Sequence, residues 1–377
     1  MSSIGGGEVE LQDSGTHPTD TGVPPDWLWA GRVPSLDGLR AVAIGLVIVA
    51  HARGTPNAPF PVFFWAFGDL GVQLFFVISG FLITLLLIRE RKRNGRISLK
   101  QFYLRRAVRI FPAYLMFMAF LGLMQALGVI SIDANNWIHS LTFTLNLIDE
   151  AERQWNVAHV WSLCVEEHFY LIWPVIVATL GVAWSWRVGW FLILTAPIWR
   201  WVIGIMIPGT LPPQTFTFSR IDSIANGCCL ALATTGRFSR QLTEFHFRRV
   251  AYVWSLIVVL LVIGRVLDLS YFVDSRMKLS FLHTITGVAF TLLLWVSICV
   301  PHGWVGRILN SKYLAWLGVL SYSLYLWQQP FLNRYNPSWM CVWPINLILA
   351  LSLSACSYLV VERPLIRWRQ RHGSVAR

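Results

Sequence analysis

An apolar segment near the start of the chain carries two basic side chains. It reads LDGLRAVAIGLVIVAH from Leu36 to His51 and has Arg40 near its beginning. At ~100° per residue, the step from Arg40 to His51 ends about 20° past three whole helical turns, so both side chains point the same way, roughly 16 Å apart along the axis. Ionisable groups inside a membrane are costly and usually functional, so this stripe predicts a polar passage within a bundle. The alternative is that Arg40 extends to the inner headgroups while His51 lies in the outer interface.

His51 could serve as a general base for a hydroxyl group, because a neutral imidazole accepts protons near neutral pH. Such a base is often oriented by a carboxylate, and HVWSLCVEEHFYLIWP (159–174) places Glu166 and Glu167 inside an apolar helix. Adjacent helical residues point about 100° apart, so only one of the two can face a given neighbour, and the sequence does not decide which. The alternative is a charge at a helix start or a structural ion pair.

Three arginines enter another apolar segment at near-helical spacing. They are Arg105, Arg106 and Arg109 in FYLRRAVRIFP, and either Arg105 or Arg106 can share a helical face with Arg109. Guanidinium groups bind phosphate in a bidentate way, which predicts a phosphate-bearing substrate on the cytoplasmic side. The alternative is that they only hold this segment inside and contact anionic lipid.

Two further charges open an apolar stretch, FSRIDSIANG, which contains Arg220 and Asp222. We expect them either to form an ion pair with each other or to line the entrance for an acceptor. The cysteines lie in or beside apolar runs without a CxxC motif, and nothing in their spacing indicates a metal site.

The elements that must position these groups are membrane helices. The chain has 377 residues, of which 55% are hydrophobic and 13% charged, whereas a soluble domain has roughly 25% charged residues. A spanning helix needs about 20 mostly apolar residues, and we count about ten such segments. They cover 36–53, 68–89, 108–130, 159–181, 187–207, 220–236, 249–267, 279–300, 312–333 and 341–361. The sequence therefore predicts an all-α, polytopic membrane helix bundle.

The charges between these segments predict their orientation. Basic residues gather at 89–109, 237–249 and 363–377, whereas 149–153 is mostly acidic and 208–219 has no charge. Since positive loops remain in the cytoplasm, both termini are expected there. The net charge of +12 is thus explained by topology and gives no reason to expect nucleic acid as a partner. We expect a disordered tail over 1–34, a membrane domain over 35–368 and a basic cytoplasmic tail over 369–377.

Several segments resemble, in order, the signatures of the acyltransferase-3 family of membrane O-acyltransferases. The family's opening signature is a basic residue, ten further residues and a histidine, here Arg40 and His51. Its second-span signature is matched by GVQLFFVISGFLIT (71–84), which includes Ser79. The other matching stretches are FYLRRAVRIFPAY, VWSLCVEEHFYLIWP, SRIDSIANG, SYSLYLW and VERP. The chain departs from the family in two places. Many relatives have Asp where Gln73 stands, and many have a His in the stretch where this chain has Gln328 and Gln329.

The resemblance implies an acyl-CoA donor, commonly acetyl-CoA, that acts as co-substrate from the cytoplasm without a metal. It also implies a hydroxyl acceptor, often a carbohydrate or glycolipid, and dependence on Arg40 and His51. Arg106 and Arg109 would support donor binding, and we place Arg105 with them. On the acceptor side we place Arg220, Asp222 and Ser79.

We therefore expect a multi-pass O-acyltransferase of a bacterial inner membrane, surrounded by membrane lipids. In this hypothesis His51 is the base and Glu166 or Glu167 orients it. Direct transfer and an acylated His51 are both compatible with the sequence, which fixes neither the acceptor, the acyl chain length nor the oligomeric state. The alternative class is a proton-coupled transporter or exporter, because embedded Arg, His and Glu suit that function as well.

Overall fold

The computed structural model describes residues 28, 31–61, 64, 67–206, 215–235, 239–269 and 275–372. Within these ranges the chain is all-helical and contains no strand, which confirms the all-α class. Most of the expected disordered tail (1–34), most of the uncharged loop 208–219 and the final residues of the basic tail 369–377 lie outside the described residues.

The α-helices follow one another along the chain, and 3₁₀- or π-helical turns lie between some of them. They are α1 (Leu36–Ala52), α2 (Phe67–Asn94), α3 (Leu99–Ala126), α4 (Ala134–Leu141), α5 (Trp155–Ala158), α6 (Val160–Met206), α7 (Thr217–Thr235), α8 (Ser239–Leu269), α9 (Ser275–Cys299), α10 (Trp304–Leu309), α11 (Lys312–Phe331), α12 (Ile345–Ser357) and α13 (Arg363–His372). The short turns are η3 (Leu145–Leu147), η4 (Glu150–Glu152), η5 (Trp339–Cys341) and the π-helical η6 (Tyr358–Glu362).

Each of the ten apolar segments coincides with helical structure, but the helices differ in length. Among the described residues, five helical stretches are long and apolar enough to cross a membrane. These stretches are Phe67–Asn94, Leu99–Ala126, Trp155–Met206, Ser280–Cys299 and Ile345–Arg369. The chain thus has the helices of a multi-pass membrane protein, while the number of about ten crossings and the side of each terminus stay predictions.

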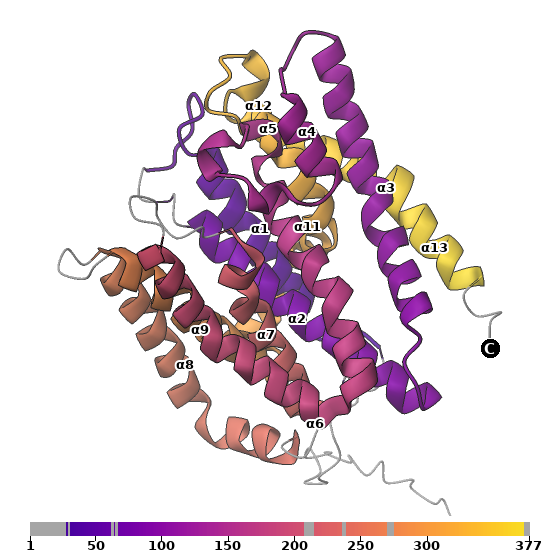
Figure 1. The fold of residues 1–377 in the computed structure, drawn as a ribbon, viewed down its shortest axis with the longest axis vertical. Coiled ribbons are helices and arrows are strands. Elements are labelled where there is room, and N and C mark those ends of the chain that lie inside the picture. The colour runs from indigo at the N-terminus through magenta and orange to yellow at the C-terminus, as the bar shows by residue number, and fades with distance from the viewer. Residues whose placement is uncertain are drawn as a thin grey trace, which may run out of the picture.

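The longest element, α6, contains two of the expected segments. Gly181 has φ 76° and ψ 178° inside it, a backbone conformation that L-residues with a Cβ rarely adopt. The helix bends sharply, and Figure 1 shows its two limbs meeting at the lower end of the molecule. The Arg91 guanidinium lies beside this bend and donates a hydrogen bond to the Val177 carbonyl at 3.4 Å. Glycine therefore separates the 159–181 and 187–207 segments without a connecting loop.

The basic region 89–109, which connects two of the expected spans, is mostly helical. Helix α2 continues to Asn94, the chain turns at Gly95 (φ 71°), and α3 begins at Leu99 after Ser98 accepts a hydrogen bond from the Gln101 amide. Lysine and arginine are good helix formers, so charge did not end these helices. The arginines of this region are consequently held on rigid elements.

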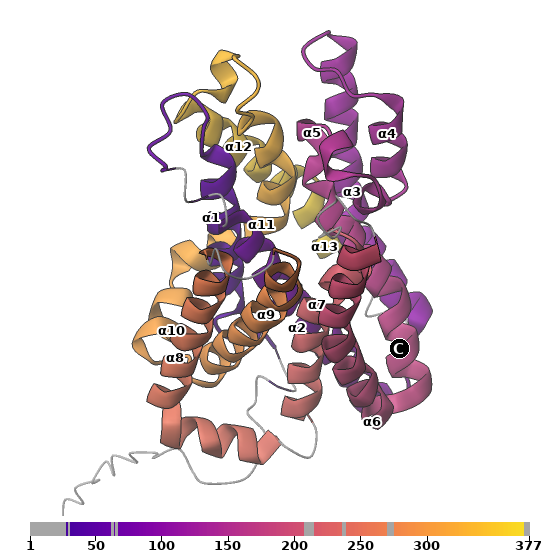
Figure 2. The same ribbon diagram turned by 60° about the vertical axis from the view of Figure 1, so that its left-hand side comes forward.

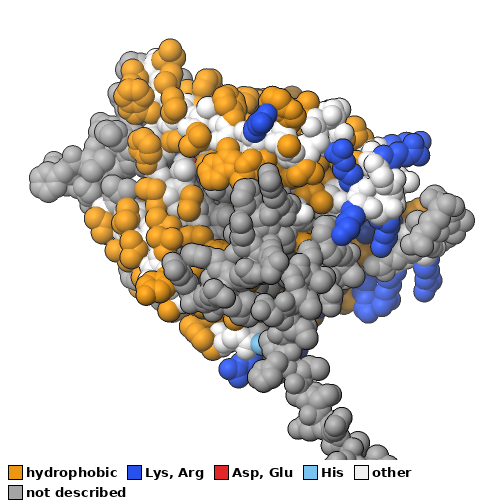
Figure 3. Space-filling view, turned by 90° about the horizontal axis from the view of Figure 1, so that it is seen from below, with side chains coloured by type: hydrophobic (Ala, Val, Ile, Leu, Met, Phe, Trp, Pro, Cys, Tyr) orange, Lys and Arg blue, Asp and Glu red, His pale blue; other side chains and the backbone are white. Residues whose placement is uncertain are grey.

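The two ends of the bundle differ in charge. The α2–α3 turn and the α6 bend lie at one end, and α4, α5 and the start of α12 lie at the other (Figures 1 and 2). Viewed from the first end, Lys and Arg side chains gather along one side of an otherwise largely apolar face (Figure 3). We call these the basic end and the opposite end. This separation agrees with the charge pattern from which the orientation was predicted.

Helices α2 and α7 cross at very close range in the centre. A Cβ added at Gly80 would lie 1.9 Å from the Ile224 carbonyl oxygen, and one at Gly227 would lie 1.9 Å from the Val77 carbonyl oxygen. Small residues permit such contact between helices in membranes, where van der Waals packing replaces the hydrophobic effect. The SGF and ANG stretches thus contain the glycines that hold the framework of the site together.

Candidate active site

A partly open cavity lies among α1, α2, α3, α6 and α11. Its polar lining contains guanidinium, carboxyl and hydroxyl groups, and apolar side chains from α2 and α3 complete its wall. The polar lining residues are Arg40, Ser79, Arg106, Arg109, Ser162, Glu166, Glu167, Ser321, Tyr322 and Tyr325. Polar side chains from five separate helices therefore share one cavity, and the predicted site residues among them come from α1, α2, α3 and α6.

The centre of the cavity is a cluster around Glu166. The Tyr170 hydroxyl donates to Glu166 Oε2 at 2.8 Å, and an Arg106 guanidinium nitrogen lies 3.9 Å from the same oxygen. The Arg106 guanidinium also stacks on the Tyr170 ring, 3.6 Å from its centroid, and the Ser79 hydroxyl bonds to Tyr170. Ser79, which we placed on the acceptor side, therefore lies next to the arginines assigned to the donor. Glu167 lines the same cavity.

The three arginines of α3 have different surroundings. Arg106 and Arg109 line the cavity together with Arg40, whereas Arg105 does not line it and pairs with Glu90 of α2. Of the two alternatives for a shared face, the structure thus places Arg106 with Arg109. Arg109 is exposed at the mouth and has no hydrogen bond or ion pair to any described residue.

His51 lies outside the lining of this cavity. Its Nδ1 is 2.8 Å from Oε1 of Gln328, and its ring makes an edge contact with Trp155 at 5.5 Å between centroids. We expected Glu166 or Glu167 to orient this histidine. The structure instead gives that position to the Gln328 amide, since Glu166 is engaged by Arg106 and Tyr170.

Two hydroxyl side chains of the cavity lining lie near the residue that contacts His51. The Ser162 and Tyr325 hydroxyls are 2.6 Å apart, and the Tyr325 hydroxyl donates to the His159 carbonyl at 2.9 Å. Both of these side chains line the cavity, and Gln328 follows Tyr325 by one turn of α11. Arg40 thus lines the cavity, whereas His51 lies outside its lining and is connected to it through Gln328, which is one turn from the lining residue Tyr325.

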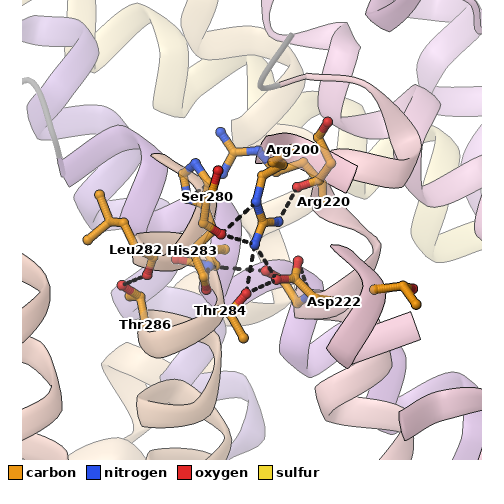
Figure 4. A network of polar contacts seen from close by, with 12 residues as sticks. Arg200, Arg220, Asp222, Ser280, Leu282, His283, Thr284 and Thr286 are labelled. Carbon is orange, nitrogen blue, oxygen red and sulfur yellow. Dashed lines mark hydrogen bonds and ion pairs between the residues drawn. The ribbon is translucent and has the colours of Figure 1, made fainter. Parts of the chain in front are cut away.

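Arg220 and Asp222 belong to a second polar cluster away from the cavity lining (Figure 4). They do not pair with each other, which corrects one of the two expectations for them. Asp222 pairs with Arg200 of α6 at 2.9 Å, and both side chains are at most 1% exposed. Arg220 pairs with Asp69 of α2 at 2.6 Å. Residues two positions apart on a helix point in different directions, so each finds a partner on a different neighbouring helix.

The cluster is completed by groups from α9. Thr284 donates to Asp222 at 2.6 Å, and His283 Nδ1 lies 3.4 Å from an Asp69 oxygen. Arg200 also donates to the Ser280 carbonyl at 2.6 Å. The cluster joins α2, α6, α7 and α9, as Figure 4 shows for its labelled members. Its buried charges are compensated within the protein, and this favours a structural role.

Sequence reasoning missed several of these residues. Arg200, Asp69 and His283 stand singly in apolar or aromatic stretches, and only their ionisable character within predicted spans marked them. Gln328 was visible as a departure from the family pattern, without an assigned role. Among the described residues, no group of three or more His, Cys, Asp or Glu side chains could hold a metal ion.

Comparison with known proteins places the chain in a family. The model of an acyltransferase domain matches residues 33–361, which include both the cavity and His51. The chain belongs to this acyltransferase family. The resemblance seen in the sequence is thereby confirmed.

Relatives of this acyltransferase come from bacteria. It is 29% identical over 359 residues to the peptidoglycan O-acetyltransferase OatA of Listeria monocytogenes, an alignment that covers 88% of this chain and 54% of the relative. It is 26% identical over 374 residues to YrhL of Bacillus subtilis, provisionally named a peptidoglycan O-acetyltransferase, with 88% and 55% covered. A provisionally named O-acetyltransferase of Staphylococcus aureus strain COL is 27% identical over 366 residues, with 88% and 57% covered. The chain thus spans about half the length of these relatives, and no solved structure matches it.

Proposed function

We propose that this acyltransferase moves an acyl group, acetyl in the first instance, from acyl-CoA to a hydroxyl group of a carbohydrate acceptor in the cell envelope. The relatives named for O-acetylation of peptidoglycan favour a glycan acceptor. We place the protein in the inner membrane of a bacterium, with the basic end of the bundle in the cytoplasm.

The cavity provides the proposed donor site. Arg40, Arg106 and Arg109 line it, and Arg109 at the mouth has no ion-pair partner among the described residues. Guanidinium groups suit the phosphates of CoA, because their fork of donors matches phosphate geometry. The narrow pantetheine arm would then extend past Glu166 toward the Ser162–Tyr325 pair.

His51 provides the proposed base. Its unbonded Nε2 takes the proton from the acceptor hydroxyl while that oxygen attacks the thioester carbonyl. The carbon–sulfur bond breaks, and the CoA thiolate receives the proton from the imidazolium. In the two-step variant, Nε2 attacks the thioester carbonyl and the CoA thiolate leaves; the acceptor hydroxyl then attacks the acylated ring, its proton passes to the thiolate, and neutral His51 is released. In either route the Tyr325 side chain must move aside to let the thioester reach His51.

One observation carries this proposal. A cavity lined by three guanidinium groups contains Tyr325, and Gln328, one turn later on α11, contacts a part-buried histidine, His51. The guanidinium groups suit a thioester with an anionic carrier, and the histidine suits the activation of a hydroxyl group.

The test uses purified protein in nanodiscs with [14C]acetyl-CoA and a soluble muropeptide. We expect acceptor-dependent release of CoA and label in the muropeptide, both abolished in His51→Ala. Tyr313→Phe serves as the matched control, because Tyr313 is exposed and outside the cavity lining. Wild-type turnover in His51→Ala would refute the role of the base. Flux of a labelled solute in proteoliposomes without CoA release would instead support the transporter.

A further inference from the structure

Two consecutive amides at the end of α11 form an ordered chain of hydrogen bonds to His51. Gln328 and Gln329 are almost completely buried, at 0% and 2% exposure. The chain begins at the backbone of Trp155 in α5, passes through both amides and ends at Nδ1 of His51. Buried amides must satisfy both their donor and their acceptor, so the direction of every bond is constrained.

The direction follows from the fixed end of the chain. The Trp155 carbonyl can only accept, so the group 2.8 Å from it is the Gln329 NH2. The Gln329 carbonyl oxygen therefore faces Gln328, whose NH2 lies 3.0 Å away. That NH2 also lies 3.4 Å from the Tyr325 carbonyl, which again can only accept. The Gln328 carbonyl oxygen is thereby left facing the histidine.

This oxygen determines which nitrogen of the imidazole carries the proton. Gln328 Oε1 lies 2.8 Å from His51 Nδ1 and has no hydrogen to donate, so Nδ1 must be the N–H donor. The neutral ring then has its lone pair on Nε2, to which no described residue hydrogen-bonds. We infer that Gln328 is a positioning residue, held by Gln329 and Trp155, that fixes His51 in the tautomer whose Nε2 is free to accept a proton. This inference rests on the proposed function, in which Nε2 is the base.

The surroundings hold the far end of this chain in place. The Trp155 indole N–H donates to the backbone carbonyl of Gln329 at 3.0 Å, and the Gln329 side-chain NH2 donates to the Trp155 backbone carbonyl, so two hydrogen bonds join these residues. The Trp155 ring also packs edge-on against the His51 ring, with 65° between their planes. Trp155 thus contacts the His51 ring and, through its backbone carbonyl, also sets the direction of the amide hydrogen bonds.

A first measurement reads the tautomer without any turnover. Protein labelled with [15N]histidine is studied by NMR in nanodiscs at pH 8, and the His51 resonances are identified by their loss in His51→Gln. We expect an N–H signal at Nδ1 and an unprotonated Nε2 in the wild type. In Gln328→Leu the ring should revert to a mixture of tautomers, whereas Gln73→Leu should keep the wild-type pattern. Gln73 is an equally buried amide on α2 and makes no contact with this chain of bonds.

A second measurement reads catalysis as a function of pH. Gln328→Leu should lower kcat by about 10²-fold while the KM for acetyl-CoA stays within twofold, because orientation of the base is lost. Gln328→Glu keeps an acceptor on Nδ1 and should recover much of kcat. A carboxylate stabilises the imidazolium, so the acid limb of the kcat profile should move to higher pH in Gln328→Glu and to lower pH in Gln328→Leu.

Defined outcomes overturn the inference. A wild-type His51 protonated at Nε2 would refute it, as would equal activities and unmoved acid limbs in both Gln328 variants. If Gln328→Leu does not fold, the wild-type spectrum and the Gln328→Glu profile decide. If the wild type transfers no acetyl group, the proposed function fails, but the spectra still test the tautomer.

Discussion

Replacement of Arg109 by glutamine tests the donor site with little disturbance of the protein. Arg109 lines the cavity, is exposed and has no hydrogen bond or ion pair to a described residue. Glu362, on which it acts electrostatically, is also influenced by Arg40, so the substitution leaves that carboxylate with a cation. Arg40 and Arg106 line the same cavity, and their repulsion with Arg109 is relieved by the substitution. We therefore expect weaker CoA binding without a loss of thermal stability.

The magnitude follows from the exposure of the side chain. A hydrogen bond to a charged group contributes about 1.5–3 kcal/mol, and the exposed position of Arg109 places it at the lower end. Since 1.4 kcal/mol corresponds to a factor of ten, the Kd for CoA should rise about tenfold in Arg109→Gln. Arg106 is more enclosed and also contacts Glu166, so Arg106→Gln should raise the Kd further and lower the melting temperature.

The assay is isothermal titration of the protein in nanodiscs with CoA, together with thermal unfolding followed by tryptophan fluorescence. Arg187→Gln is the matched control, because Arg187 packs over Trp184 at 4.4 Å and does not line the cavity. A twofold or smaller change in the Kd for CoA in Arg109→Gln, with a raised KM for the acceptor, would show that these arginines do not bind the donor.

Three further substitutions test other parts of the structure. Arg105→Gln should leave the Kd for CoA within twofold, because Arg105 pairs with Glu90 outside the cavity lining; a tenfold rise on titration with CoA would contradict this assignment. Gly80→Ala should destabilise the protein by about 1–3 kcal/mol, seen as a lower melting temperature, because its Cβ would overlap a carbonyl of α7; unchanged melting would argue against the close crossing. Arg200→Met should lower the free energy of unfolding by about 3–5 kcal/mol, because Asp222 is left buried without a cation. The double variant Arg200→Met with Asp222→Leu should recover part of this loss in thermal unfolding, and a double variant as unstable as the single would refute the pairing.

Apolar segments predicted where the helices lie, because the hydrophobic runs of a membrane protein are long and interrupted at loops. The helix ends were less predictable. Leu99 begins α3 nine residues before the apolar part of that segment, since arginines and lysines continue a helix as readily as leucine does. The bend in α6 depends on a positive φ at Gly181, which hydropathy does not detect.

The site could be predicted where the period of one helix determined the geometry. Arg106 and Arg109 share the cavity with Arg40, and the structure places Glu166 within the same lining. Contacts between helices were not accessible in this way. The partner of His51 was expected to be a carboxylate and is the Gln328 amide, which is 277 positions away along the chain.

Contacts between helices also explain why Arg220 and Asp222 do not pair with each other. An ion pair between these two residues was one of the two expectations, but side chains two positions apart on α7 diverge toward different helices. Each is buried, at 2% and 0% exposure, and must therefore find its counter-charge on the helix that it faces. Asp69 and Arg200 supply those charges from α2 and α6.

The Arg220–Asp222 cluster and the cavity thus differ in how their charges are balanced. In the Arg220–Asp222 cluster every buried charge is paired across helices, so the cluster contributes a unique packing of α2, α6, α7 and α9 and has little capacity for a ligand. In the cavity, guanidinium groups outnumber the carboxylates of the lining by three to two, and Arg109 has no protein partner among the described residues. A surplus of cations beside an open cavity favours binding of an anion. We therefore propose that this surplus of positive charge, more than the presence of ionisable groups as such, directs a phosphate-bearing donor to the cavity.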